Sequence, residues 1–170
     1  MRIVIVSENI SMSMGGEASL GMYYFRLFRR RGIDVAAVCH ARVRDEIITT
    51  LPRDEAIRFH FVEDTPIQVL VWRVSQLVPT RIRDLIFGQL VHISTMHRVR
   101  RIVRQLCVDS EDCICLEPSP ITPLGASFMY GLGIPVVIGP LCGGLEFPPA
   151  FRYMDGKYTR YFKRIDLINL

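Results

Sequence analysis

The sequence predicts an α/β fold in which a mostly parallel sheet lies between two layers of helices. Five short, mostly apolar runs alternate along the chain with stretches of helical periodicity. Strands separated by helices form βαβ units, whose crossovers are right-handed and whose strands run parallel. The 170 residues are enough for one domain with a substantial core, and we expect that domain to span residues 1–154.

The first half of the chain contains three predicted strands and two predicted helices. The strands are expected at residues 2–7, 34–40 and 56–63. The first helix, residues 17–31, carries an arginine run in its last turn, where the helix dipole favours cations, and it ends before Gly32. The second helix, residues 41–51, is short because Pro52 ends it.

The second half begins with a long helical and basic region, residues 65–106, which Pro79 interrupts. Apolar residues at three- and four-residue spacing along its later part form one stripe, which is typical of an amphipathic helix. Two more strands are expected at residues 112–116 and 135–139, with a glycine-terminated helix at 122–133 between them. Residues 155–170 are expected to form a C-terminal helical tail.

Composition excludes several classes of protein. With 49% hydrophobic and 22% charged residues, the chain is neither disordered nor fibrous, and a net charge of +4 does not indicate nucleic-acid binding. The apolar run in MRIVIV is too short for a secretory signal peptide, and the uncharged segment 118–145 contains five prolines, which argue against a spanning helix. The five cysteines lack zinc-site spacing, so we expect buried free thiols and a reducing, cytoplasmic location.

The segment SMSMGGEAS, after the first strand, is a candidate anion-binding loop. Gly15 and Gly16 have no Cβ, so their backbone can approach a ligand and offer N–H groups at a helix N-terminus. The spacing of Gly15, Gly16 and Gly21 does not match the G-x-G-x-x-G loop of dinucleotide-binding enzymes, and Met22 stands where a P-loop needs lysine. Both of those functions are disfavoured, and an ordinary glycine turn is the alternative.

Loops after the fourth and fifth strands should meet this glycine loop, because the carboxyl ends of parallel strands share one edge of the sheet. LEPSPITP, residues 116–123, has three prolines beside polar side chains that can hydrogen-bond. GPLCGGLEFPPAFR, residues 139–152, contains another glycine pair followed by Glu146. Rigid, polar-tipped loops beside a glycine turn suit a hydroxyl-rich small molecule. The alternative is that proline and glycine only punctuate these loops.

Together these segments resemble the N-terminal domain of a GT-B glycosyltransferase of the retaining family 4 type. The resemblance rests, in chain order, on MRIVIVSENISMSMGGEASL, YYFRLFRRRGIDVAAVCHARVRDE, EPSPITPLGASFMYGLGIPVVIGPLCGG and FPPAFR. It covers nearly the whole chain. It implies a Rossmann-like three-layer domain that binds the acceptor and faces a second, donor-binding domain across a cleft.

The resemblance also implies a function and a set of site residues. The expected function is transfer of a sugar, with retention, from a nucleotide-sugar donor to a sugar or lipid-linked acceptor, in glycan or glycolipid synthesis. Gly15, Gly16 and Glu17 would contact the donor diphosphate. The acceptor side would be framed by His40, Arg42, Glu117, Ser119, Gly143, Gly144 and Glu146. No cofactor or metal is expected, because loop amides and basic residues of the donor domain would neutralise the leaving diphosphate.

Two departures from the family pattern shape these expectations. The donor-binding domain and its glutamate motif are absent from the sequence, so the chain alone is expected to be inactive. Related enzymes often place a histidine just before the EP segment, where this chain has Leu116, which can neither hydrogen-bond a sugar nor carry a proton. The alternative is therefore a non-catalytic partner subunit of a split transferase, or a degenerate binding module. The other histidines, His60, His92 and His97, are expected at structural or surface positions.

The basic region between residues 67 and 106 supports one further hypothesis. It contains seven arginines and one acidic residue, Asp84. Basic side chains next to an anionic lipid surface contribute roughly 1 kcal/mol of binding each. The region could therefore hold the protein at the inner face of the membrane, with the apolar segment IQVLVW, residues 67–72, buried at the interface. The alternatives are a solvated helix face for the arginines and packing against the sheet for the apolar segment.

Overall fold

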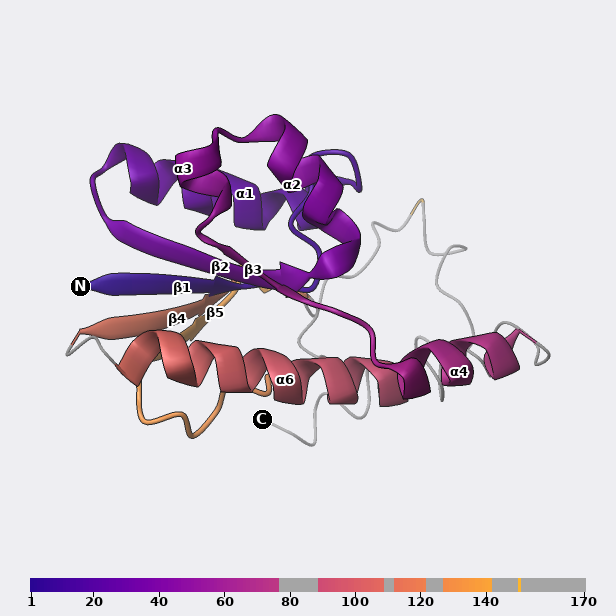
Figure 1. Cartoon of the computed structure of the whole chain (residues 1–170). Coiled ribbons are helices and arrows are strands. Elements are labelled where there is room, and N and C mark those ends of the chain that lie inside the picture. The colour runs from indigo at the N-terminus through magenta and orange to yellow at the C-terminus, as the bar shows by residue number, and fades with distance from the viewer. Residues whose placement is uncertain (77–88, 109–111, 122–126, 142–149, 151–170) are drawn as a thin grey trace.

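A computed structural model describes residues 1–76, 89–108, 112–121, 127–141 and 150 of the chain (Figure 1). At its centre, five parallel strands pair in the order β3-β2-β1-β4-β5. They are β1 (Arg2–Val6), β2 (Asp34–His40), β3 (Phe59–Val62), β4 (Cys113–Glu117) and β5 (Val136–Ile138). Helices cover both faces of the sheet. The fold is therefore the predicted α/β type, a Rossmann-like three-layer arrangement.

Alternating side chains of β1 explain why the sheet forms the middle layer. Ile3 and Ile5 belong to one core cluster, and Val4 and Val6 to the other, because successive side chains of a strand face opposite sides. All four are buried. The continuous apolar run that predicted this strand reflects burial on both faces, as is usual in parallel sheets.

One layer of helices comes from the first half of the chain. It consists of α1 (Gly16–Arg30), the short 3-10 helix η1 (Ala41–Val43), α2 (Arg44–Thr50) and α3 (Arg53–Ala56). The aromatic ring of Phe25 in α1 packs on that of Phe59 in β3, with ring centroids 4.6 Å apart. Gly21 of α1 lies very close to Ile10, since a Cβ added at Gly21 would be 2.9 Å from Ile10 Cγ1. The loop between β1 and α1 is thereby packed directly onto the helix.

The other layer contains α4 (Pro66–Ser75) and α6 (Gln89–Val108). In Figure 1, α6 runs along the sheet and α4 extends from its end, away from the strands. The sheet-facing side of α6 buries Met96, Val99 and Val103. Helix α4 begins with a capping box, in which Thr65 and Gln68 each accept a hydrogen bond from the other's backbone N–H.

The amino ends of the strands are closed by ion pairs. Arg2 Nε donates to one carboxylate oxygen of Asp34 at 2.7 Å, and Arg58 Nη1 donates to the other at 2.8 Å. These hydrogen bonds, that from Arg2 above all, hold the pKa of Asp34 below its ordinary value. The cluster ties β1 to β2 and to the segment before β3.

A disulfide joins Cys107, near the end of α6, to Cys113, the first residue of β4. The expectation that all cysteines are free thiols is therefore wrong for this pair, because α6 ends beside the strand that follows it and the two Cα atoms are 5.5 Å apart. Cysteine usage consequently no longer supports a reducing compartment. Cys39 and Cys115 are free and buried, and burial raises the pKa of each thiol to about 12. Cys142 lies outside the described residues.

The helix predicted at residues 122–133 is wrong for its described part, because residues 127–133 form turns and bends. The guanidinium of Arg100 in α6 donates to three backbone carbonyls within residues 128–131. Gly131 and Gly133 have positive φ angles, which a helix cannot accommodate. A distant side chain thus satisfies backbone groups that a helix would otherwise bond. Residues 122–126 and the predicted tail, 155–170, lie outside the described residues.

Candidate functional site

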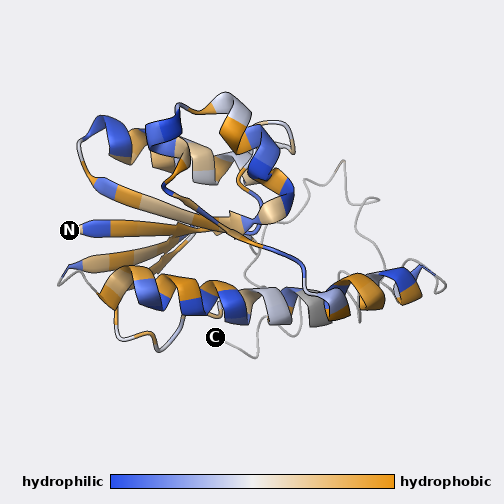
Figure 2. Cartoon of the chain, in the orientation of Figure 1, coloured by the Kyte–Doolittle hydropathy of each residue, from blue (hydrophilic) through white to orange (hydrophobic). Residues whose placement is uncertain are grey.

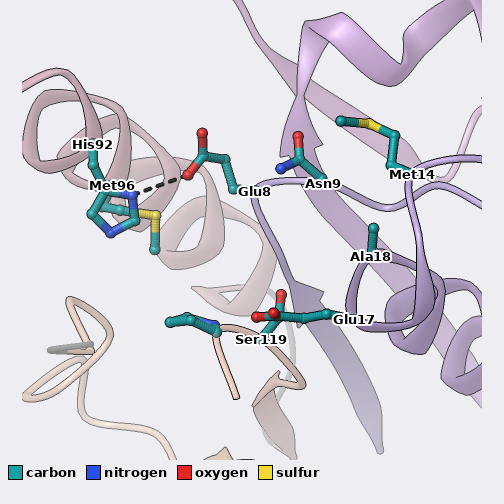
Figure 3. Close-up of a pocket in the computed structure, with 9 residues that line it drawn as sticks. Glu8, Asn9, Met14, Glu17, Ala18, His92, Met96 and Ser119 are labelled. Atoms are coloured by element: carbon teal, nitrogen blue, oxygen red, sulfur yellow. Dashed lines mark hydrogen bonds and ion pairs between the residues drawn. The ribbon is translucent and has the colours of Figure 1, made fainter. Parts of the chain in front are cut away.

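A pocket of about 270 Å³ lies at the carboxyl ends of β1 and β4 (Figure 3). These strands are neighbours, but the chain continues from β1 toward β2 and from β4 toward β5, on opposite sides. In open α/β sheets, ligands bind where the strand order reverses in this way. The pocket is lined by Glu8, Asn9, Met14, Glu17, Ala18, His92, Met96, Ser119 and Pro120.

Three segments far apart in the sequence supply these side chains. The loop after β1 and the start of α1 supply residues 8–18, α6 supplies His92 and Met96, and the loop after β4 supplies Ser119 and Pro120. His92 is four residues before Met96, so it continues the stripe by which α6 packs on the sheet. One wall of the pocket is therefore formed by the first residues of the sheet-facing stripe of α6.

Glu8 is held by two cationic or hydrogen-bonding partners. Its Oε2 accepts a hydrogen bond from His92 Nδ1 at 3.0 Å, and its Oε1 accepts one from Arg42 Nη2 at 3.0 Å. The bond from His92, followed by the charge of Arg42, holds the pKa of Glu8 below its ordinary value despite burial. Because the Nδ1 proton of His92 is directed to Glu8, the Nε2 atom of the neutral ring is a hydrogen-bond acceptor.

Arg42 is oriented by His40, which is buried at the end of β2. His40 Nδ1 accepts hydrogen bonds from both the backbone N–H and the Nε–H of Arg42, each at 3.1 Å. The other ring nitrogen therefore carries the proton and donates to Asp64 Oδ1 at 3.1 Å. The chain of contacts from Asp64 through His40 to Arg42 thus fixes the guanidinium against Glu8, so His40 acts on the site through Arg42.

Buried polar groups lie behind the pocket at the ends of β1 and β4. Ser7 Oγ is 2.6 Å from Ser119 Oγ. Glu117 is buried and accepts a hydrogen bond from Ser127, and burial raises the pKa of its carboxyl above the ordinary value. The side-chain oxygen of Asn9 is buried without a hydrogen-bond partner among the described residues. Because this oxygen has almost no accessible surface, a ligand hydroxyl can reach it only when the Asn9 side chain turns toward the pocket.

The glycine loop is anchored from outside the pocket by Glu46 of α2. Its carboxylate accepts hydrogen bonds from the hydroxyls of Ser11 and Ser13, at 2.6 and 2.9 Å, and from the backbone N–H of Met12 at 2.7 Å. These bonds hold the pKa of Glu46 below its ordinary value, with that from Ser11 contributing most. The segment before the glycine pair is therefore fixed, and its polar groups are directed toward α2.

The N-terminus of α1 is open. Gly15 is its N-cap, with φ of 100° and no side-chain capping bond, a conformation that favours glycine. A Cβ at Gly15 or Gly16 would meet no atom within 4 Å. The first N–H groups of a helix have no intrahelical partner, so this terminus can accept an anion above the glycine pair.

Glu17 connects the glycine loop to the loop after β4. Its Oε1 accepts a hydrogen bond from the backbone N–H of Ile121 at 3.0 Å. Together with Glu8, it places two carboxylates in the pocket lining, beside the apolar side chains of Met14 and Met96. This mixture of acceptors and apolar surface suits a neutral, hydroxyl-rich ligand inside the pocket, whereas an anion is favoured only at the glycine rim.

The residues implied by the family resemblance fall into three groups. Glu17 and Ser119 line the pocket, and Gly15 and Gly16 lie in the same loop between lining residues Met14 and Glu17. His40, Arg42 and Glu117 lie behind the lining, where Arg42 contacts Glu8 directly. Gly143, Gly144 and Glu146 lie outside the described residues. The functional roles of all these residues stay predictions.

Three lining residues with chemical capacity were missed from the sequence: Glu8, Asn9 and His92. His92 was expected at a surface or packing position, but it faces the pocket and bonds to Glu8. One signal could have found it, since a histidine in register with an apolar helical stripe must face the sheet. No comparable pattern marks Glu8 or Asn9, except that they directly follow a buried strand.

Protein-family models, curated proteins and solved structures gave no match to the chain. None of the helices in the described ranges is long and apolar enough to cross a membrane. Within the same part of the chain, no three His, Cys, Asp or Glu side chains are grouped as a metal site requires. The function is therefore inferred from the pocket and its residues.

Proposed function

We propose that this chain is the acceptor-side domain of a retaining glycosyltransferase that uses a nucleotide-sugar donor. The observation that carries the proposal is the pocket at the switch in strand order, with an open helix N-terminus at its rim and unpaired hydrogen-bonding capacity inside. The sequence resemblance supports the same function independently of the geometry. Both favour a small ligand with many hydroxyl groups and an anionic ligand beside it.

In this proposal the acceptor sugar binds inside the pocket. A hydroxyl of the acceptor donates to His92 Nε2, which the Glu8 contact leaves as an acceptor. Asn9 offers its unpaired side-chain oxygen to a second hydroxyl, and the methionine side chains cover the apolar face of the sugar ring. Glu8 is a positioning residue here, because it sets the tautomer and orientation of His92 rather than contacting the sugar.

The donor diphosphate binds at Gly15 and Gly16 in this proposal. The absence of a Cβ lets the phosphate oxygens reach the N–H groups at the start of α1. Glu17 points to the loop after β4 and its carboxylate is bonded to Ile121, which draws its charge away from the rim. The nucleotide itself would bind to a second domain, as in the family that the sequence resembles.

The test is to titrate the isotope-labelled chain with methyl glycosides and, separately, with uridine and guanosine diphosphate, and to follow backbone amides by NMR. Glycosides are expected to shift the amides of Asn9 and Ser119, and diphosphates those of Gly15 and Gly16. His92→Ala should weaken glycoside binding about tenfold, since about 1.4 kcal/mol of hydrogen bonding is lost. The matched control is His97→Ala, five residues along α6 at an exposed position outside the pocket lining, which should leave binding unchanged.

Two results would overturn this proposal. One is that neither ligand class shifts amides around the pocket. The other is binding of a nicotinamide dinucleotide at the glycine rim in preference to the diphosphates, which would indicate an oxidoreductase. Turnover of a nucleotide sugar by the chain alone would contradict the expectation that a second domain is needed.

A second candidate is a binding module that has lost catalysis. The observation in its favour is Leu116, which is buried in the core, so that the position where related enzymes often have a histidine gives the pocket no polar group. The two candidate functions predict different results when a donor-binding domain is added to the chain. Sugar transfer in its presence supports the transferase, and sugar binding without transfer supports the degenerate module.

A further inference from the structure

Helix α4 buries two polar residues and exposes most of its apolar residues. The two buried residues of this helix are Gln68 and Ser75. Its apolar side chains are exposed instead, with Leu70 60% and Trp72 61% accessible. The remaining exposed apolar residues are Ile67, Val69 and Val74. In Figure 2 the ribbon of α4 is coloured mostly as hydrophobic residues, and this helix projects away from the sheet.

The inverted pattern is held in place by specific polar contacts. Gln68 Nε2 donates to Thr95 Oγ1 of α6 at 2.9 Å, and both residues are buried. The capping box at Thr65 uses the Gln68 side chain as well, through its Oε1 atom. Rotating α4 to bury its apolar side would break both interactions. The exposed apolar surface is therefore a fixed feature of the packing.

The charges around this surface identify its partner. Neither α4 nor α6 contains an acidic residue, whereas together they carry five arginines. Arg73 lies on α4, and Arg101 and Arg104 are exposed on α6 without an ion-pair partner in the described part of the chain. An anionic lipid surface complements them and accepts exposed tryptophan and aliphatic side chains.

We propose that α4 docks this protein onto anionic membranes, with Ile67, Leu70 and Trp72 entering the headgroup region and the arginines contacting lipid phosphates. This contact does not depend on what the pocket binds. The position of α4 does set the distance between the membrane contact and the pocket. Thr95, which is bonded to Gln68 of α4, is adjacent to Met96 in the pocket wall. The lipid surface would thus lie beside the pocket.

The chain provides its own probe for the test, because Trp72 is its single tryptophan. The full chain is mixed with vesicles of phosphatidylcholine alone, or of phosphatidylcholine and phosphatidylglycerol in equal parts. We expect co-sedimentation with the anionic vesicles, a blue shift of the Trp72 emission, and quenching by lipids brominated near the headgroup. Salt should weaken the binding, since the arginine contacts are screened.

Variants separate the surface from the rest of the protein. Leu70→Glu should weaken binding to anionic vesicles about tenfold or more, because a carboxylate replaces an inserted side chain and repels the lipid. Arg101→Gln with Arg104→Gln should weaken it less and reduce its salt dependence. The matched control is Ile57→Glu, at an exposed apolar residue next to β3, which should bind as the unaltered chain does.

The proposal is overturned if anionic vesicles fail to bind the chain at low salt, or if Leu70→Glu binds them as well as the control. A dimer in light scattering that Leu70→Glu dissociates, without vesicle binding, would identify a second copy as the occupant instead. Brominated-lipid quenching of the unaltered chain needs no variant. It therefore decides the question even if a substitution disturbs folding.

Discussion

The two ends of the sheet use the same kind of interaction for different purposes. At the amino end, Asp34 is bonded to Arg2 and Arg58, and a disulfide lies beside this cluster. At the carboxyl end, Glu8 is bonded to Arg42 and His92 in the same two-partner manner. Both carboxyls have a lowered pKa for this reason. The arrangement of charges alone therefore does not distinguish a structural cluster from a site.

The two clusters differ in the hydrogen-bonding groups that remain unused on the residues around each carboxylate. The guanidiniums at the amino end carry only donors, which bond to Asp34 and to neighbouring backbone carbonyls. One donor, Arg58 Nε, is buried without a hydrogen-bond partner among the described residues, but Arg58 does not line the pocket. At the carboxyl end, one ring nitrogen of His92 is bonded to Glu8, and the rest of the ring faces the pocket. Asn9 adds an acceptor that has no hydrogen-bond partner in the part of the chain that the structure describes. Residual hydrogen-bonding capacity next to a cavity is thus the mark of the functional end.

The largest expected effect on stability comes from opening the disulfide at the amino end. Reduction should lower the free energy of unfolding by about 2 kcal/mol, as expected for closing a short loop, while binding at the carboxyl end stays unchanged. Urea denaturation with and without a reducing agent measures it. A variant with both Cys107→Ala and Cys113→Ala should not respond to the reductant. An unchanged midpoint for the natural chain would show that the disulfide does not stabilise this end.

A smaller loss of stability is expected from Asp34→Asn, which leaves Arg2 and Arg58 without their carboxylate. We expect about 1 kcal/mol at neutral pH, the range of partly exposed ion pairs. Because the folded pKa of Asp34 is lowered, its stabilisation exists above the unfolded value near 3.8 and disappears as the pH falls through the folded value. Urea denaturation of the natural chain and of Asp34→Asn at pH 7 and at pH 2.5 measures this pH dependence. Asp54→Asn, at an exposed position, serves as control, and an equal loss there would contradict the expectation.

The smallest effect is expected from Glu117→Gln at the carboxyl end, and it has the opposite sign. Burial raises the folded pKa of Glu117, so its contribution to stability is present below the unfolded pKa and is lost as the pH rises through the folded value. The variant should therefore gain less than about 1 kcal/mol at pH 7 and nothing at pH 3. Thermal denaturation across this pH range tests it. A loss of stability at pH 7 would show that the ionised carboxylate is well compensated.

Most of the fold could be predicted because it depends on local patterns. Short, mostly apolar runs located the five strands of the described residues, and Gly32 and Pro52 marked the ends of two helices correctly. The helix predicted over 122–133 failed in its described part because Arg100, about 30 residues earlier, bonds the carbonyls that a helix would use. The disulfide was missed because only the packing of α6 beside β4 brings Cys107 to Cys113.

The candidate site was predicted less completely, for a similar reason. The switch in strand order places Glu17 and Ser119 at one edge, and parallel strands make that edge predictable. His92 is 84 residues from Glu8, and no spacing rule relates a helix to a strand over that distance. The family resemblance implied His40 on the acceptor side, and the structure shows its ring engaged with Arg42 and Asp64.

The close approach of Gly21 to Ile10 has a consequence for how this sequence can change. A methyl group at position 21 would collide with Ile10, whose backbone belongs to the loop that leads to the glycine pair. The tightest of these contacts is with Cγ1 of Ile10, so alanine at position 21 would require a residue without γ carbons, such as alanine, at position 10. The sizes of the side chains at the two positions are therefore coupled. Redesign of the rim for a larger or smaller anion can begin at this pair without altering any residue that lines the pocket.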